Sequence, residues 1–294
     1  MIEIRLPISP DLGQRLEDFF CEDYQQCWML HEDFKTGAQQ LRGYFAEREP
    51  MEQELEALKE KFPELGSVAC EVLDLADKDW KEAYKIHFKP WSERGLHWVP
   101  VWERDKYELP AGEQIVYLDP GMAFGTGNHE TTRLCVRRLL DARDVWGAEI
   151  AAKRVIDAGC GSGILAISAR KLGFTEVYGF DLDPDSVRIS LDNEKLCDLE
   201  GTIEFRWADL NEGLAGTTGD LLLVNILANV LCDHVRLLCH SVNKGGWLVL
   251  SGILAREIEA VHAVFSPVIS RIAGYEPPLD SRVDGDWADL CYRF

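Results

Sequence analysis

The stretch VIDAGCGSG (155–163) constrains the fold of this chain more than any other. An apolar run ends in a turn that holds Gly159, Gly161 and Gly163, and the residues SGILAISARKLG (162–173) then have helical apolar spacing. Glycine has no Cβ atom, so a ligand can approach the backbone of such a turn closely. The N–H groups at the start of the next helix are unpaired and can bind a carboxylate or a phosphate. The sequence therefore predicts an α/β domain with a ligand at this turn.

Apolar runs and helical patterns alternate from about residue 118 onward, which indicates a doubly wound sheet. Residues 220–227 are nearly all apolar, as expected for a central parallel strand. Further strands are predicted at 154–159, 176–183, 203–209 and 245–253, and helices at 129–142, 162–173, 184–197, 229–242 and 257–265. A closing pair of strands is predicted at 268–275 and 286–294. The fold class that follows is α/β.

The first 77 residues have a different pattern, with short strands and two amphipathic helices. Ser9 is expected to cap the first helix, with Pro10 at its first position. Strands are predicted at 2–8, 27–32, 40–46 and 67–75, and helices at 10–22 and 50–62. The order β-α-β-β-α-β is that of a small α+β ferredoxin-like domain.

Residues 78–117 lie between these two regions and are rich in tryptophan and proline. This composition predicts an ordered, extended connector that packs on a neighbouring domain, unlike a flexible linker. Aromatic packing is the expected role of its tryptophans, and a substrate groove lined by them is the alternative. The predicted domains are therefore 1–77, 78–117 and 118–294.

Charge and composition bound the partners of the chain. The formal net charge is −20 and the pI about 4.7, with no basic stripe, which disfavours nucleic acid and favours basic partners. No apolar run approaches the roughly 20 residues that a membrane helix needs, and the first residues lack a secretory signal pattern. The nine cysteines form no CxxC pair, so we expect reduced thiols and no metal site. A cytoplasmic monomer is expected.

Acidic residues near the glycine turn indicate what it binds. Asp181 and Asp183 follow Gly159 by 22 and 24 residues, where a carboxylate can accept hydrogen bonds from ribose hydroxyls. The glycine spacing is GxGxG, unlike the dinucleotide GxGxxG, and Asp157 precedes the first glycine by two residues. The turn thus resembles motif I of the class I S-adenosylmethionine-dependent methyltransferases, in which the methionine end of the cofactor lies at this turn.

That resemblance implies roles for several residues. Asp157 would receive the amino group of S-adenosylmethionine, and Gly159 and Gly161 would line the turn beside it. The segment ADL (208–210) resembles the one that contacts the adenine ring in this superfamily. Asp209 is therefore a candidate cofactor contact, and a solvated strand end is the alternative.

An asparagine follows the apolar run of the predicted fourth strand of this domain. In open α/β sheets ligands bind beyond the carboxyl ends of the strands, so Asn225 is well placed for function. Its side-chain oxygen can accept a hydrogen bond from an attacking N–H, which orients the nitrogen lone pair towards the methyl carbon. Asn225 is therefore the predicted catalytic residue, and a turn-capping asparagine is the alternative.

Five segments together resemble the ribosomal protein L11 methyltransferases. They are LDPGMAFGTGNHETT (118–132), VIDAGCGSGILAISARKLG (155–173), GFDLDPDSV (179–187), VNILANVL (224–231) and GGWLVLSGIL (245–254). The resemblance implies a ferredoxin-like N-terminal domain that recognises L11 and a Rossmann-like catalytic domain that uses S-adenosylmethionine. By motif position it implies that Thr132, Gly159, Asp181 and Asn225 contact the cofactor.

The loop at 118–132 has three glycines and no lysine, so it does not suit a phosphate. We expect it to close over the methyl-donating end of the cofactor, with Phe124 covering that end and Thr132 reaching the cofactor from the following helix. His129 could be a catalytic base. Its place near a helix start disfavours positive charge, so a neutral capping or packing role is predicted.

The expected function is the methylation of amino groups of ribosomal protein L11, on lysine side chains, the N-terminal α-amine or both. The acidic chain is expected to prefer the free, basic L11 to L11 that is already bound to RNA. Two alternatives stay open at this point. One is methylation of lysines in a different basic protein, and the other is a non-catalytic, cofactor-binding module associated with the ribosome.

Overall fold

The computed structural model describes residues 2–22, 27–32, 39–45, 47–74, 89–119 and 129–294. Contacts between Cα atoms divide the chain into two compact units, Met1–His87 and Phe88–Phe294. No helix in the described ranges is both long and apolar enough to span a bilayer.

The first unit has a four-stranded antiparallel sheet in the order β2-β3-β1-β4. Its elements are β1 (Ile2–Ile8), α1 (Pro10–Glu22), β2 (Trp28–Glu32), β3 (Gln39–Phe45), α2 (Arg48–Lys61), the 3-10 helix η1 (Pro63–Ser67) and β4 (Glu71–Asp74). The order confirms the predicted ferredoxin-like arrangement. The Ser9 hydroxyl accepts a hydrogen bond from the Leu12 N–H at 3.3 Å, so the predicted cap is also present.

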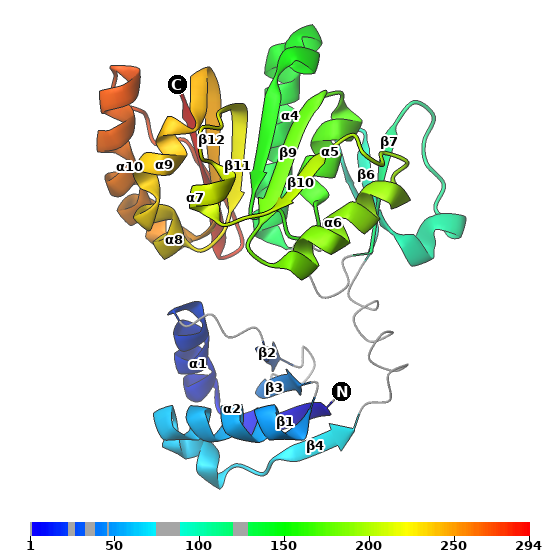
Figure 1. The fold of residues 1–294 in the computed structure, drawn as a ribbon. Coiled ribbons are helices and arrows are strands. Elements are labelled where there is room, and N and C mark those ends of the chain that lie inside the picture. Colours follow the sequence, from blue (N-terminus) through cyan, green and yellow to red (C-terminus); the bar gives the residue numbers. More distant parts are fainter. Residues whose placement is uncertain (1, 23–26, 33–38, 46, 75–88, 120–128) are drawn as a thin grey trace. The chain divides into compact units, whose positions relative to one another are not determined.

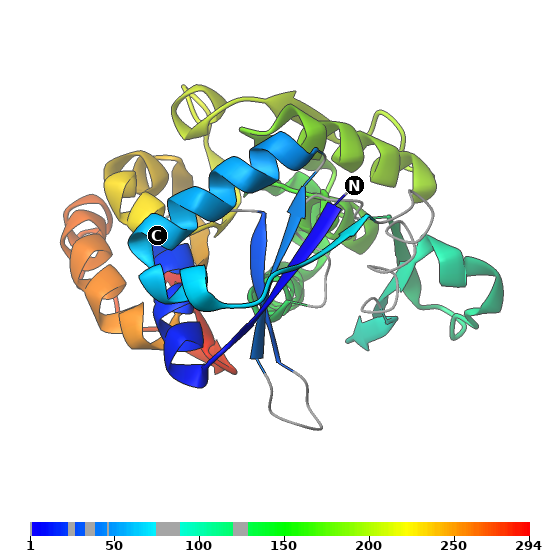
Figure 2. The same cartoon turned by 90° about the horizontal axis from the view of Figure 1, so that it is seen from below.

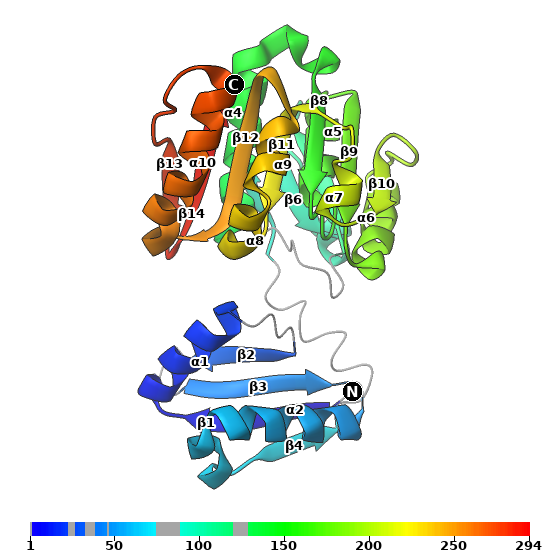
Figure 3. The same cartoon turned by 60° about the vertical axis from the view of Figure 1, so that its left-hand side comes forward.

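Both helices of this unit pack on one face of the sheet (Figures 2 and 3). Leu12 and Leu16 of α1 and Leu55 of α2 are buried in one apolar cluster. Ile4 and Leu41 supply this cluster from the sheet, because alternate residues of a strand point to the same face. The unit therefore has a core of its own.

A small three-stranded sheet begins the second unit, where the sequence predicted an extended connector. It contains β5 (Trp91–Glu93), β6 (Leu96–Pro100) and β7 (Gln114–Leu118), with the 3-10 helix η3 (Val101–Lys106) after β6. The rings of Trp91 and Trp98 stack at 3.9 Å between centroids. The Trp98 indole N–H donates to the Ser168 hydroxyl at 2.8 Å, and Leu96 joins the same core. The two tryptophans thus have the predicted packing role, whereas residues 78–88 lie outside the described residues.

The main sheet of the second unit has seven strands in the order β10-β9-β8-β11-β12-β14-β13. The strands are β8 (Arg154–Ala158), β9 (Glu176–Asp181), β10 (Glu204–Trp207), β11 (Gly219–Asn225), β12 (Val242–Leu254), β13 (Ser281–Asp284) and β14 (Trp287–Arg293). β8 to β12 run parallel, and β14 pairs antiparallel with β12 and β13. The strand order reverses between β8 and β11, and ligands bind at such a switch point. The predicted α/β fold class is confirmed.

Helices cover both faces of this sheet (Figure 1). One face packs against α4 (Glu130–Trp146), α5 (Ile164–Leu172) and α6 (Pro184–Leu196), with η4 (Gly147–Ala152) after α4. The other packs against α8 (Ala228–Asp233), α9 (Val235–His240) and α10 (Ile258–Ala273), with the short α7 (Leu210–Gly213) and η5 (Ala255–Glu257). Val155 and Ile156 of β8 lie in different cores, as alternation along a buried strand requires.

Two predicted elements differ from the structure. The predicted helix at 229–242 is two short helices, α8 and α9, which meet at His234. The predicted strand at 268–275 is wrong, because α10 continues through Pro267 to a left-handed cap at Gly274. Phe265 and Ile269 are buried four residues apart, which is helical spacing. The predicted partner of the last strand is therefore replaced by β13, which pairs with β14 on the side away from β12.

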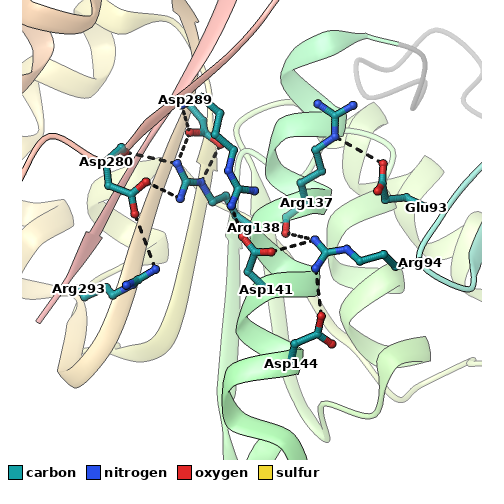
Figure 4. Close-up of polar contacts among 10 residues, drawn as sticks. Glu93, Arg94, Arg137, Arg138, Asp141, Asp144, Asp280, Asp289 and Arg293 are labelled. Atoms are coloured by element: carbon teal, nitrogen blue, oxygen red, sulfur yellow. Dashed lines mark hydrogen bonds and ion pairs between the residues drawn. The ribbon is translucent and has the colours of Figure 1, made fainter.

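Helix α4 is held by ion pairs on two sides (Figure 4). Arg94, between β5 and β6, pairs with Asp141 at 2.9 Å and Asp144 at 3.0 Å. On the other side Arg138 pairs with Asp289 of β14 at 2.6 Å. Because His129 caps α4 and Thr132 lies in its first turn, these contacts fix the position of a predicted site residue.

Candidate functional site

The glycine turn lies between β8 and α5, as predicted. Gly159 has φ of +77°, and a Cβ atom there would lie 2.9 Å from Cγ2 of Ile226, the residue after β11. Both the left-handed backbone and the close approach require glycine at this position. The Gly159 and Cys160 N–H groups donate to the Phe180 carbonyl at 2.9 Å, which ties the turn to β9. The turn is thus held at the carboxyl ends of three strands.

Asp181 links the end of β9 to this turn. Its Oδ2 accepts a hydrogen bond from the Gly161 N–H at 2.8 Å, and its Oδ1 accepts one from the Asp183 N–H at 2.9 Å. Burial raises the pKa of this carboxyl. Each carboxylate oxygen can accept a second bond, so Asp181 has capacity for ligand hydroxyls. Asp183 instead caps α6 through the Asp185 N–H at 3.0 Å.

Asp157 is buried beneath the turn, with 1% of its surface exposed. Its Oδ2 accepts a hydrogen bond from the Ala166 N–H in α5 at 3.1 Å. Burial, together with the negative charge of Asp181, raises the pKa of Asp157 to about 7. The carboxyl therefore titrates close to neutral pH.

Two polar oxygens in this region are buried without a hydrogen bond. They are Asn225 Oδ1, at the end of β11, and Thr132 Oγ1, in the first turn of α4, and neither has a partner among the described residues. Ser251 pairs with Asn225 in the sheet register, and its hydroxyl donates to the Thr131 carbonyl at 3.0 Å. The first turn of α4 is therefore tied to the strand beside Asn225. A buried acceptor without a donor is costly, so both oxygens suit a ligand that supplies one.

His129 caps α4 and packs on β14. Its Nδ1 accepts a hydrogen bond from the Thr131 N–H at 3.3 Å, and its ring packs on Trp287 at 5.0 Å between centroids. Burial lowers the pKa of His129. A ring nitrogen that accepts must be unprotonated, so the predicted neutral capping role is confirmed.

The structure does not show a ligand-facing role for two other predicted cofactor contacts, Asp209 and Phe124. Asp209 follows β10 and caps α7, where its Oδ1 accepts a hydrogen bond from the Glu212 N–H at 2.8 Å. Its role towards the adenine ring stays a prediction. Phe124 and the rest of 120–128 lie outside the described residues, so the closing role of that loop also stays a prediction.

The sequence reasoning missed the contacts to the turn from α6, of which Ser190 makes one. The Ser190 hydroxyl donates to the Gly161 carbonyl at 2.8 Å and is fully buried. The sequence shows that Ser190 is a polar residue on the inner face of a predicted helix, but it does not show which group Ser190 bonds to.

The donor set suits a ligand with an amino acid end and a ribose. The glycine turn lets a ligand approach the backbone closely, Asp157 offers a buried carboxylate, and Asp181 offers acceptor sites for hydroxyls. Asn225 and Thr132 add unpaired oxygens. No described residues form a group of three or more His, Cys, Asp and Glu side chains that could hold a metal ion. The residues present fit the predicted cofactor, S-adenosylmethionine.

Comparison with known proteins decides the family. Residues 15–275 match the family described as ribosomal protein L11 methyltransferase (PrmA), which is most of the chain. The chain belongs to this family. A ribosomal protein L11 methyltransferase of Pelobacter propionicus is 38% identical over 263 residues, covering 86% of this chain and 81% of that protein. One of Chromohalobacter salexigens is 35% identical over 279 residues, covering 88% and 89%.

A solved structure supports the same assignment. The crystal structure of a ribosomal protein L11 methylase from Lactobacillus delbrueckii subsp. bulgaricus has a TM-score of 0.56 and 32% sequence identity. The matched region covers 68% of this chain and 94% of the chain in that crystal structure. Membership of the L11 methyltransferase family confirms the predicted resemblance, and with it a methyltransferase that uses S-adenosylmethionine.

Proposed function

We propose that this chain methylates amino groups of ribosomal protein L11, on lysine side chains, the N-terminal α-amine or both. The observation that carries the proposal is Asn225, whose buried amide oxygen has no partner among the described residues. It ends the central parallel strand β11, beside the glycine turn, in a chain of the L11 methyltransferase family. An N–H of the incoming amine is the donor that this oxygen needs.

We assign the ends of the cofactor from the chemistry of the residues. The N–H groups of Gly159 and Gly161 already donate to Phe180 and Asp181. The glycines of the turn therefore suit the methionine end by letting it approach the backbone closely, and Asp157 suits its amino group. Asp181 suits the ribose hydroxyls, and Asp209 lies after β10 on the side proposed for the adenine ring.

The methyl-donating end is proposed to face Asn225 and Thr132. Phe124 keeps its predicted role as a cover for that end. When bound, S-adenosylmethionine supplies an electrophilic methyl group on a sulfonium.

The residues of the chain prepare the amine for this transfer. An ammonium has no lone pair, so the amine must lose a proton before it attacks. Loss of water around the amine lowers its pKa, because desolvation disfavours the charged form. The Asn225 oxygen then accepts an N–H and directs the lone pair, which is a positioning effect. We therefore assign no obligatory general base.

Net charge supports a free, basic substrate. The chain carries −20 at neutral pH, so its field attracts a basic protein and repels RNA. The ferredoxin-like unit is proposed to recognise L11, and the enzyme is proposed to act as a monomer in the cytoplasm. We expect faster methyl transfer to free L11 than to L11 in assembled ribosomes, measured with radiolabelled S-adenosylmethionine. Equal initial rates for both substrates would contradict this part of the proposal.

The substrate itself is tested by labelling a cell extract in the same way. The purified chain, labelled S-adenosylmethionine and the extract should give one main labelled protein with the mass of L11. Purified L11 should become labelled too, and mass spectrometry of its peptides then locates the methylated amines. A labelled basic protein other than L11 would support the first alternative. No labelling with intact cofactor binding would support a non-catalytic module.

We expect the affinity for S-adenosylmethionine to depend on pH through Asp157. Its pKa is raised from 3.8 to about 7, so the carboxyl is mostly protonated at about pH 5.5 and mostly charged at about pH 7.5. Only the charged form pairs with the amino group, so affinity should rise roughly ten-fold over this range, as calorimetry can measure.

The Asp157→Asn variant is the control for this pH dependence. It keeps an acceptor for the Ala166 N–H but cannot titrate. It should bind the cofactor weakly and with a flat pH profile. The raised pKa also means that Asp157 contributes stability to the wild-type apoprotein that is lost as pH rises from about 4 to about 7, and the variant should lack this contribution. An unchanged pH slope of cofactor affinity in the variant would refute the role of Asp157.

A further inference from the structure

Helix α6 has a polar inner face, which is unusual for a helix that packs against a sheet. Ser190 and Asn193 lie about one turn apart on this face, and Cys197, the C-cap of α6, continues it; their exposed fractions are 0%, 0% and 1%. Buried polar side chains are normally retained where they satisfy other buried groups. The hydrogen-bond partners of these residues therefore indicate which parts of the molecule this face holds in place.

All three side chains bond to backbone groups of other segments. Ser190 bonds to the glycine turn at Gly161. Cys197 Sγ lies 3.2 Å from both the N–H and the carbonyl of Tyr117 in β7. The face thus contacts the glycine turn at one end and the end of β7 at the other.

Asn193 alone joins both of these segments. Its Nδ2 donates to the Ser162 carbonyl in the glycine turn at 2.9 Å. Its Oδ1 accepts a hydrogen bond from the Asp119 N–H, just after β7, at 2.8 Å. One amide therefore links the backbone of the turn to the backbone just after β7.

We propose that Asn193 is a positioning residue for methyl transfer, which fixes the glycine turn relative to Asp119 at the end of β7. The proposal rests on the proposed function, in which the turn binds the methionine end of the cofactor. Asn193 would contact neither cofactor nor substrate. It acts through the Ser162 carbonyl and the Asp119 N–H, whose positions it sets.

The chemistry of the amide explains why asparagine is needed. The site requires a donor on one side and an acceptor on the other, and a buried backbone group left unpaired is costly. Aspartate could accept from Asp119 but could not donate to Ser162, and alanine could do neither. Substitution should therefore loosen the turn even where the rest of α6 stays folded.

The neighbouring residue offers a matched control for a purely structural effect. Glu194 is also buried, with 1% exposed, and its Oε1 accepts from the N–H groups of Thr202 at 2.9 Å and Ile203 at 2.8 Å. Glu194→Ala removes two buried hydrogen bonds to backbone from the same helix, as Asn193→Ala does. The Glu194 bonds, however, lie away from the glycine turn.

The test compares Asn193→Ala, Asn193→Asp and Glu194→Ala in the full chain. The dissociation constant of S-adenosylmethionine, the single-turnover rate on L11 at saturating cofactor, and Tm are measured for each. We expect both Asn193 variants to weaken cofactor binding about ten-fold and to slow single turnover about ten-fold. Glu194→Ala should lower Tm to a similar degree but change both functional values less than about two-fold.

Two results would overturn the proposal. One is normal cofactor affinity and normal single turnover in a folded Asn193 variant. The other is a functional loss in Glu194→Ala that matches the Asn193 variants at equal loss of Tm. Asn193→Asp keeps one of the two bonds, so it serves if Asn193→Ala does not fold. A wild-type chain that binds S-adenosylmethionine but does not methylate L11 would refute the proposed substrate, and the dissociation constants would still decide the role of Asn193.

Discussion

Replacing Asn225 with alanine is expected to lower the single-turnover rate of methyl transfer by roughly a hundred-fold or more. The same change should alter the dissociation constant of S-adenosylmethionine only a few-fold. The reason is that the Asn225 oxygen is a buried acceptor without a partner in the described structure, and the incoming amine is its proposed donor. Without it the amine binds in many orientations, and few of them direct the lone pair towards the methyl group.

Asn229→Ala is the matched control for this experiment. Asn229 is exposed and lies four residues further along the chain, and its Oδ1 accepts a local hydrogen bond from the Val230 N–H at 2.9 Å. Its replacement should leave the rate within about two-fold, since its side chain is exposed and its hydrogen bond is local, and such surface substitutions have small effects. Normal single turnover in Asn225→Ala would refute the catalytic role. An equal loss in both variants would also refute it, because the effect would then belong to the local fold.

The central part of the fold could be predicted because its signals are local. Buried parallel strands are short apolar runs, and the turn after β8 needs glycine for its left-handed backbone at Gly159. The sequence spacing between the glycines and the two acidic residues Asp157 and Asp181 then located the candidate site. Each of these features depends on a few neighbouring residues, so one sequence is enough to find it.

The small sheet at the start of the second unit could not be predicted in the same way. Its strand β6 pairs with β5 and β7, and Trp98 is held by Ser168, which lies 70 residues away in the sequence. Tryptophan and proline in short runs are also typical of connectors. The contacts that make these residues strands come from tertiary packing, which the local pattern does not contain.

The C-terminal part of α10 shows a second limit. Residues after Pro267 form a short apolar run, and such a run is typical of either a strand or a buried helix. Proline favours a break in the helix, yet the helix continues because Ile269 is buried against the same core as Phe265. Packing outweighed the local preference.

Positioning contacts in the site were also beyond sequence reasoning. Asn193 bonds to Asp119, 74 residues earlier, and to Ser162, 31 residues earlier. A single asparagine in a helix gives no signal for either partner. Candidate ligand contacts could be read from motifs, whereas the residues that hold them had to be found in the structure.

The largest effect on stability is expected from the buried ion pair between α4 and β14 (Figure 4). Arg138 has a side chain 1% exposed and Asp289 one that is 0% exposed. The Arg138 Nε and Nη2 atoms donate to the two carboxylate oxygens of Asp289 at 2.9 and 2.6 Å. Nη1 donates to Asp280 at 2.8 Å. The guanidinium is thus buried, and its two hydrogen bonds to the Asp289 carboxylate offset most of the cost of burying its charge.

Asp289→Ala should therefore lower the free energy of unfolding by about 3–5 kcal/mol, because it leaves a buried charge without its partner. For a unit of this size that loss lowers Tm by roughly 10 °C. Urea denaturation followed by tryptophan fluorescence measures it. Asp144→Ala is the control on the same helix, since Asp144 is 49% exposed in its pair with Arg94, and it should cost less than about 1 kcal/mol.

A double variant, Arg138→Met with Asp289→Leu, separates the unpaired charge from the loss of packing. Removing both charges and filling their volume with apolar atoms should recover most of the stability that Asp289→Ala loses. If the double variant is as unstable as Asp289→Ala, the cost comes from the altered packing of α4 and not from the charge. If Asp289→Ala is no less stable than Asp144→Ala, the pair does not hold α4 against β14, and another contact must fix the helix that carries Thr132.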